Sequence, residues 1–173
     1  MEGRKIPIIG FAANSGTGKT TLIEELISIF KDLDIRVGVI KHSHHSFSID
    51  KPGKDSYRFR QAGADQVLVG GPGQWALMVD TQEELSLDDY LQTLDVNMLD
   101  IVLVEGFKHL AFPKIEIYRP SLGQALLSNN DESIIAIATD DASSIDRDLS
   151  ILDLNDAKQI ADFIIENIIK VKS

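Results

Sequence analysis

The feature that most constrains the fold is an apolar run followed by a small-residue loop that ends in Gly-Lys-Thr. The run covers residues 6–12, and the loop covers residues 13–20 with the sequence Ala-Asn-Ser-Gly-Thr-Gly-Lys-Thr. Glycines let the backbone curl so that several N–H groups face one anion, and a helix that begins near Lys19 adds the positive end of its dipole. The pattern therefore predicts a strand, a phosphate-binding loop (a P-loop, or Walker A motif) and a helix.

Two residues of this P-loop carry specific chemistry. Lys19 can reach the β- and γ-phosphates of a nucleoside triphosphate, and the Thr20 hydroxyl can ligate Mg²⁺. Ala13 stands where the first glycine of the common pattern usually sits, and the alternative is a flexible glycine turn before an ordinary helix. The preceding strand and the following amphipathic helix favour phosphate binding. The predicted nucleotide-binding residues of the loop are Asn14, Ser15, Gly16, Thr17, Gly18, Lys19, Thr20 and Thr21.

Length and composition indicate one compact domain, residues 1–173. The chain is 43% hydrophobic and 25% charged, as in ordinary globular proteins, and no segment approaches the ~20 apolar residues of a membrane span. The absence of cysteine and of a visible secretory signal predicts a cytoplasmic protein. The net charge of −10 argues against binding to nucleic acid or to an anionic membrane. The locally basic segment 41–60 indicates a confined anionic ligand, or else a solvated surface.

Hydrophobic patterning predicts alternating strands and helices. The last helix is expected to begin at Asn155 as its N-cap, with Ile160, Phe163, Ile164 and Ile168 as its buried stripe. Gly63 is expected to end a helix that covers residues 52–63. A further helix is expected at 87–94, and the helix after the P-loop buries an apolar stripe over 22–30. The remaining strands are expected at 35–40, 66–69, 75–79, 101–104, 114–119 and 134–138. This order predicts an α/β protein with a three-layer α/β/α P-loop NTPase fold and a mostly parallel sheet.

Ligands of such sheets lie beyond the carboxyl ends of the strands. This rule selects three residue pairs, Lys41–His42, Glu105–Gly106 and Thr139–Asp140. Glu105 can hold Mg²⁺ or orient an attacking water, and Lys41 can offset the charge of the phosphates. The alternatives are a strand-end acid that faces solvent and a surface lysine. The predicted catalytic residues are Lys19, Lys41 and Glu105, and the predicted metal ligands are Thr20 and Glu105.

Base recognition and the histidines are less specific signals. Asp140 could accept hydrogen bonds from N1–H and the N2 amino group of guanine, although the residues alone do not separate GTP from ATP. The loop after residue 40 carries His42, His44 and His45. Neutral imidazoles ligate transition metals, but a structural site would need further ligands from the fold. Contact with a phosphate or a partner, or plain loop polarity, are the alternatives.

Several blocks of the sequence resemble the molybdopterin-guanine dinucleotide biosynthesis protein B (MobB) family. The most specific are Lys-Pro-Gly-Lys-Asp-Ser at residues 51–56 and Val-Glu-Gly-Phe-Lys at residues 104–108. Ile-Lys-His-Ser-His-His at residues 40–45 and the P-loop also match. The likeness covers nearly the whole chain.

This resemblance implies a GTP-binding adaptor of molybdenum cofactor maturation. It implies GTP and Mg²⁺ as ligands, weak GTP hydrolysis at most, a homodimer, and assistance to the guanylyltransferase that attaches GMP to molybdopterin. Residues 41–58 would line the cavity near the γ-phosphate or meet the partner or the pterin phosphate. The residues so assigned are His42, His44, Asp50, Lys54, Asp55 and Arg58. Two alternatives stay open: a P-loop small-molecule kinase, and a metal-delivery GTPase that uses His42, His44 and His45.

Overall fold

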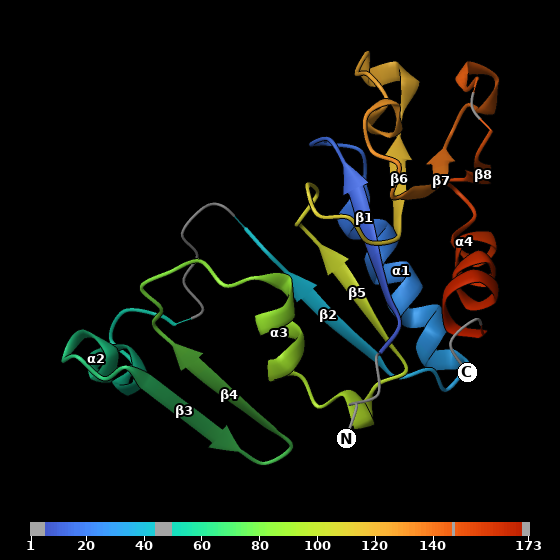
Figure 1. Ribbon diagram of the computed structural model, residues 1–173. Coiled ribbons are helices and arrows are strands. Elements are labelled where there is room, and N and C mark those ends of the chain that lie inside the picture. Colours follow the sequence, from blue (N-terminus) through green and yellow to red (C-terminus); the bar gives the residue numbers. More distant parts are fainter. Residues whose placement is uncertain (1–5, 44–49, 147, 171–173) are drawn as a thin grey trace. The chain divides into compact units, whose positions relative to one another are not determined.

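The computed structural model describes residues 6–43, 50–146 and 148–170 (Figure 1). The chain forms two compact units. The first unit runs to His42 and resumes at Leu91, and the second extends from Ser43 to Tyr90. The hairpin and the short helix predicted between residues 52 and 79 therefore belong to a different unit from the P-loop. No helix in the described ranges has both the length and the apolar character needed to cross a bilayer.

A six-stranded sheet of parallel strands forms the first unit, in the order β2-β5-β1-β6-β7-β8 over the described residues. Its strands are β1 (Ile8–Ala13), β2 (Val37–Lys41), β5 (Ile101–Glu105), β6 (Lys114–Tyr118), β7 (Ile134–Thr139) and β8 (Ser150–Asp153). β5 lies between β1 and β2 and pairs with both. β8 is a short edge strand that hydrophobic patterning does not predict. The α/β fold class with a parallel sheet is confirmed, and all strands end at the same edge.

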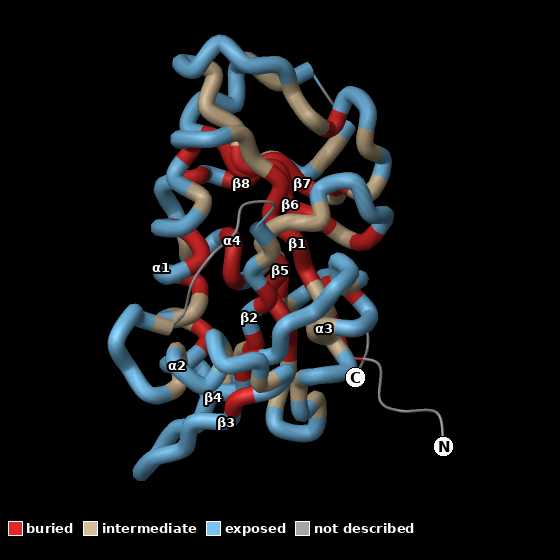
Figure 2. Tube along the Cα trace, turned by 90° about the vertical axis from the view of Figure 1, so that its left-hand side faces the viewer, coloured by how far each residue is buried: buried red, intermediate tan, exposed pale blue. Residues whose placement is uncertain are grey.

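Two helices cover one face of this sheet. They are α1 (Lys19–Asp32) and α4 (Ala157–Ile164), which continues as a π-helical turn over Ile165–Ile169. Figure 2 shows the buried residues along the central strands and the inner sides of these helices. The predicted stripes are largely confirmed, with Phe163 only partly buried. The buried helix residues are Leu22, Ile23, Leu26, Phe30, Ile160, Ala161, Ile164 and Ile168.

The start of α4 differs by one residue from the prediction. Asp156 caps the helix, because its carboxylate accepts a hydrogen bond from the Gln159 N–H. Asn155 precedes the cap, and its N–H donates to the side chain of Asp153. Asp and Asn are about equally good N-caps, so the sequence preference could not choose between the two positions. The turn that follows β8 made the choice.

Close approach on the opposite face requires glycine at two positions. The connection from β5 to β6 crosses β1 and places the Phe112 ring 2.6 Å from where a Cβ on Gly10 would lie. Leu99 comes within 2.7 Å of the same point at Gly38. Both sites lie inside strands, where a glycine often marks the close approach of another segment. Short segments thus pack directly against the backbone of the sheet.

Two charged residues of β6 are buried on this opposite face. Lys114 is 1% exposed, its Nζ donates to two carbonyl oxygens of residues 108–110, and it lies 2.7 Å from Asp131. Burial by itself would raise the pKa of Asp131, but hydrogen bonds from Lys114 and from the hydroxyl and N–H of Ser133 hold that pKa below the ordinary value. Glu116 accepts from the N–H groups of residues 127–128. These buried charges therefore fasten two loops to the sheet.

The second unit contains a short helix and an antiparallel hairpin. The helix α2 covers Asp55–Gln61, and the hairpin is formed by β3 (Gln66–Gly71) and β4 (Gln74–Val79). The two predicted strands and the turn between them are confirmed. Gly63 ends the helical segment as predicted, with φ +101° and its N–H donating to the Arg60 carbonyl.

The other helical segments are short. The helix α3 covers Leu87–Thr93, as predicted within one residue, and it begins in the second unit and ends in the first. The 3₁₀ helices of the described residues are Val96–Met98, Pro120–Leu122, Leu127–Asn129 and Ala142–Ser144.

Candidate functional site

The P-loop connects the end of β1 to the start of α1, as predicted. Gly16 and Gly18 have φ angles of +83° and +94°, a left-handed conformation that favours glycine. Thr17 is 3% exposed, and its hydroxyl donates to the Asn14 carbonyl at 3.1 Å. No side chain of the described residues caps the start of α1, and its first turn contains no acidic residue. The loop is thus stabilised by a hydrogen bond between its own residues, while the positive end of the helix dipole stays available to an anion.

Glu105 lies between two lysines at the carboxyl edge of the sheet. Its Oε1 is 3.4 Å from Lys19 Nζ, and its Oε2 is 3.2 Å from Lys41 Nζ. The three side chains meet because β5 separates β1 from β2, with Glu105 in register with Lys41 and with Phe11. Glu105 is 16% exposed and does not simply face solvent. The structure therefore brings together the three residues that the sequence selects as catalytic, and their role stays a prediction.

The segment after Glu105 is fixed by a contact with His42. Gly106 has φ +108°, and a Cβ there would lie 2.9 Å from the Cβ and the carbonyl oxygen of His42. The His42 N–H donates to the Glu105 carbonyl at 2.8 Å, and its ring stacks on Phe107 with 4.5 Å between centroids. A glycine at position 106 is thus required by both sterics and conformation. His42 lies beside the lysine–glutamate cluster, whereas His44 and His45 fall outside the described residues.

Sequence reasoning missed one cation of this edge, Arg119. It directly follows β6, which ends at Tyr118. Its Nε donates to the Thr17 carbonyl at 2.9 Å, and its Nη1 forms an ion pair with Asp140. The strand-end rule could have found it, but a predicted strand at 114–119 placed Arg119 inside the strand. Asp140 lies where predicted, after β7, and its Oδ2 is engaged by this arginine.

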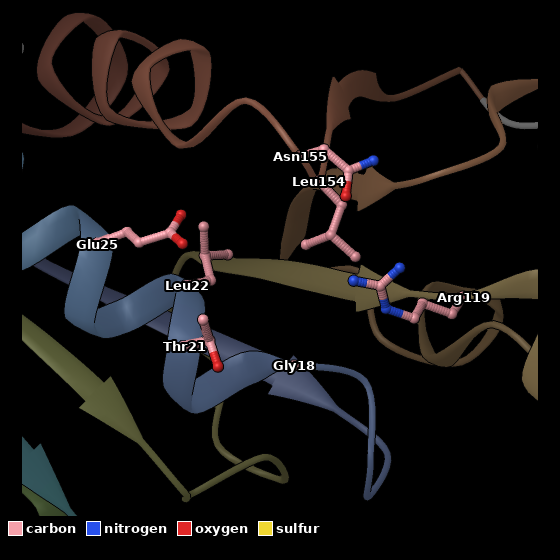
Figure 3. Close-up of a pocket in the computed structure, with 7 residues that line it drawn as sticks. All are labelled: Gly18, Thr21, Leu22, Glu25, Arg119, Leu154 and Asn155. Carbon is pink, nitrogen blue, oxygen red and sulfur yellow. The ribbon is translucent and has the colours of Figure 1, made fainter.

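A pocket lies beside the P-loop on the side of Arg119 (Figure 3). Its volume is about 290 Å³. Figure 3 shows Arg119 extending from the end of β6 toward Leu154, above the start of α1. The residues that line the pocket are Gly18, Thr21, Leu22, Glu25, Arg119, Leu154 and Asn155. The pocket therefore joins the P-loop to the turn after β8.

The other residues assigned to a substrate or partner belong to the second unit. Asp50 accepts from the Ser56 hydroxyl at 3.0 Å. Asp55 and Arg58 form an exposed ion pair at 3.7 Å, one helical turn apart on α2. Lys54 is exposed and directly precedes that helix. These contacts are internal to the unit, and the role of the four predicted residues stays a prediction.

No group of three side chains suited to a metal ion occurs in the part of the chain that the structure describes. The histidine-based metal site stays untested, because two of its three histidines lie outside that part. The candidate site is therefore the P-loop with its lysine–glutamate cluster on one side and the Arg119 pocket on the other.

The chain is similar to proteins of one family. The sequence model of the family described as molybdopterin guanine dinucleotide synthesis protein B (MobB) matches residues 8–140. The molybdopterin-guanine dinucleotide biosynthesis adapter protein of Escherichia coli (strain K12) is 45% identical over 172 residues, or 96% of both chains. The protein of that name from Haemophilus influenzae is 46% identical over 92% of this chain and 88% of its own. A crystal structure of Bacillus subtilis MobB has a TM-score of 0.76 at 26% identity, covering 94% of this chain and 98% of that one.

Proposed function

Because the chain belongs to the molybdopterin guanine dinucleotide synthesis protein B family, we propose that it acts as an adapter protein in molybdopterin guanine dinucleotide biosynthesis. In this proposal the protein is a cytoplasmic homodimer. It binds GTP with Mg²⁺ at the P-loop and assists the guanylyltransferase that attaches GMP to molybdopterin. The observation that carries the nucleotide site is the P-loop with Lys19, Lys41 and Glu105 gathered beside it.

The residues of the loop fit a triphosphate by charge and by geometry. The left-handed glycines and the start of α1 present N–H groups to an anion, and two lysine ammonium groups lie at the end of the loop. Lys19 would contact the β- and γ-phosphates, and Lys41 would add a second positive charge beside them. The ion pairs with Glu105 hold both lysines in place when no phosphate neutralises them.

The donor set also fits Mg²⁺, which prefers oxygen ligands. In this proposal the Thr20 hydroxyl at the start of α1 and the Glu105 carboxylate at the end of β5 supply such oxygen ligands. When bound, Mg²⁺ would neutralise charge on the β- and γ-phosphates. In this proposal Glu105, which pairs with two lysines, orders these cations and Mg²⁺ and does not activate a water. This pairing supports GTP hydrolysis that is weak at most.

GTP binding is tested by calorimetry on the Lys19→Ala variant, with Lys31→Ala as the matched control. Lys31 lies in the last turn of α1, at the end remote from the P-loop. Hydrogen bonds to charged groups contribute about 1.5–3 kcal/mol, so we expect Lys19→Ala to lose at least about tenfold in affinity. Lys31→Ala should bind as the wild type does. Equal GTP affinity in the Lys19→Ala variant would refute the assignment of the loop.

The adapter role is tested by measuring guanylylation of molybdopterin with the purified guanylyltransferase. We expect the wild-type protein to raise the rate or yield, and the Lys19→Ala variant to raise it less. The protein should sediment as a dimer under the same conditions. An unchanged yield with the wild-type protein would contradict the adapter role. Transfer of labelled phosphate from GTP to a small metabolite by this protein would favour the kinase alternative instead.

A further inference from the structure

The order of the strands divides the candidate site into two sides. The P-loop follows β1, at the centre of the sheet. β5 and β2 lie on one side of β1 and carry Glu105 and Lys41, which mark the end where the γ-phosphate would lie. β6, β7 and β8 lie on the other side. A nucleotide with its terminal phosphate at Lys19 and Lys41 must therefore direct its nucleoside toward β6–β8.

The pocket beside Arg119 lies on that second side and has the character of a nucleoside site. Its volume of about 290 Å³ is close to the lower end of the ~300–1,000 Å³ range of ligand pockets. Leu22 and Leu154 form the apolar part of its lining, although both side chains are largely buried in the core. Asn155 and Glu25 add groups that can hydrogen-bond a base edge or a sugar hydroxyl. The lining is thus mainly polar, and convergent polar groups of this kind can fix the orientation of a small molecule.

The charges of the pocket argue against a second phosphate. The positive charge of Arg119 is neutralised by its ion pair with Asp140. Glu25 adds a carboxylate to the lining. An anion would therefore meet no net positive charge here, whereas the neutral base and ribose of a nucleotide would not be repelled.

Arg119 connects this pocket to the P-loop. Its Nε donates to the Thr17 carbonyl, within the loop, and its guanidinium also lines the pocket. Thr17 and Arg119 are 102 residues apart in sequence, so this contact ties the loop to the far side of the sheet. The planar guanidinium group bonds the Thr17 carbonyl and the Asp140 carboxylate at the same time. A lysine ammonium group could not make both bonds with the same geometry.

We propose that Arg119 is a positioning residue that fixes the P-loop and forms the wall of a nucleoside pocket whose polar contact to the base or sugar is Asn155. This inference rests on the proposed binding of a nucleoside triphosphate at the P-loop. It assigns the Asp140 carboxylate to the orientation of Arg119, and it predicts that the two halves of the nucleotide are recognised by separable residues.

The test compares GTP with inorganic tripolyphosphate, which has the phosphates but no nucleoside. Calorimetry on the full chain gives the affinity of both probes for Asn155→Ala and Arg119→Gln, and circular dichroism confirms that each variant folds. The control is Arg36→Gln. Arg36 also bonds one aspartate, Asp100, and one backbone carbonyl, but it lies at the opposite edge of the sheet, before β2.

We expect Asn155→Ala to weaken GTP about three- to tenfold, as for the loss of one uncharged hydrogen bond, and to leave tripolyphosphate unchanged. Arg119→Gln should weaken both probes, and GTP more than tripolyphosphate, whereas Arg36→Gln should change neither. Equal losses for both probes in Asn155→Ala, or unchanged GTP affinity in either pocket variant, would overturn the inference. If the wild-type protein binds neither probe, the proposed function itself fails. If the wild type binds both probes but the pocket variants do not change as expected, only this inference fails.

Discussion

Glu105 is expected to affect a bound triphosphate in two ways: it competes with the phosphates for Lys19 and Lys41, and it is a predicted ligand of Mg²⁺. Replacing Glu105 with glutamine separates these two effects. In the structure Glu105 pairs with Lys19 at 3.4 Å and with Lys41 at 3.2 Å. A triphosphate that takes over these lysines must compete with both pairs. Partly exposed ion pairs contribute about 0–1 kcal/mol each, and Lys41 is 60% exposed. Together they oppose Mg²⁺-free binding by up to about 2 kcal/mol, or up to about thirtyfold in affinity.

We therefore expect Glu105→Gln to bind GTP more tightly than the wild type when Mg²⁺ is removed by a chelator. With Mg²⁺ present the variant lacks a predicted metal ligand, so the enhancement of affinity by Mg²⁺ should shrink and hydrolysis should weaken. Calorimetric titrations with and without Mg²⁺ measure this ratio. Asp100→Asn is the matched control, because it removes one carboxylate at the other edge of the sheet, where it pairs with Arg36. The reasoning is refuted if Mg²⁺-free affinity does not rise in Glu105→Gln, or if Asp100→Asn behaves in the same way.

Three further predictions concern the opposite face of the sheet and are checked by chemical denaturation. Lys114→Met removes a buried ammonium group that pairs with Asp131, and we expect it to lower the unfolding free energy by about 3–5 kcal/mol; a change below about 1 kcal/mol would contradict the pairing. The folded pKa of Asp131 is lowered, so its stabilisation is complete above the unfolded value of about 4 and is lost as the pH falls below it. Asp131→Asn should therefore flatten the acid limb of the stability profile, and an unchanged limb would exclude this residue as a cause. Gly10→Ala should lower the unfolding free energy by about 1–3 kcal/mol, because its methyl group would overlap the Phe112 ring. An unchanged unfolding free energy would show that the ring can move away without loss of packing.

Much of the fold could be predicted because its signals are local. The continuous apolar residues of β5 predict a strand that is buried on both faces, and all four residues from Ile101 to Val104 are buried. The two strands of the second unit were also predictable, because a glycine-rich turn separates two short apolar runs. The order of the strands in the sheet was not predictable, since no local pattern places β5 between β1 and β2. β8 is four residues long at the edge of the sheet, too short for a clear period.

The candidate site shows the same division. Lys19, Lys41 and Glu105 could be selected from the sequence because each follows a recognisable strand or glycine loop. Arg119 could not, since a shift of one residue in the predicted end of β6 decides whether it belongs to the strand or to the edge where ligands bind. Boundaries of elements are the least reliable part of such predictions.

The alternation of Lys114, Ile115, Glu116 and Ile117 is typical of a strand with one polar, solvated face. The structure buries both faces, because the two charged side chains find partners in loops that follow or precede them in the chain. The sequence by itself determined the P-loop, the main strands and the family likeness, since these depend on residues that are neighbours along the chain. The tertiary structure alone decided the strand order, the burial of Lys114 and Glu116, and the contact of Arg119 with Thr17. These depend on packing between segments up to 102 residues apart, which no local pattern of residues encodes.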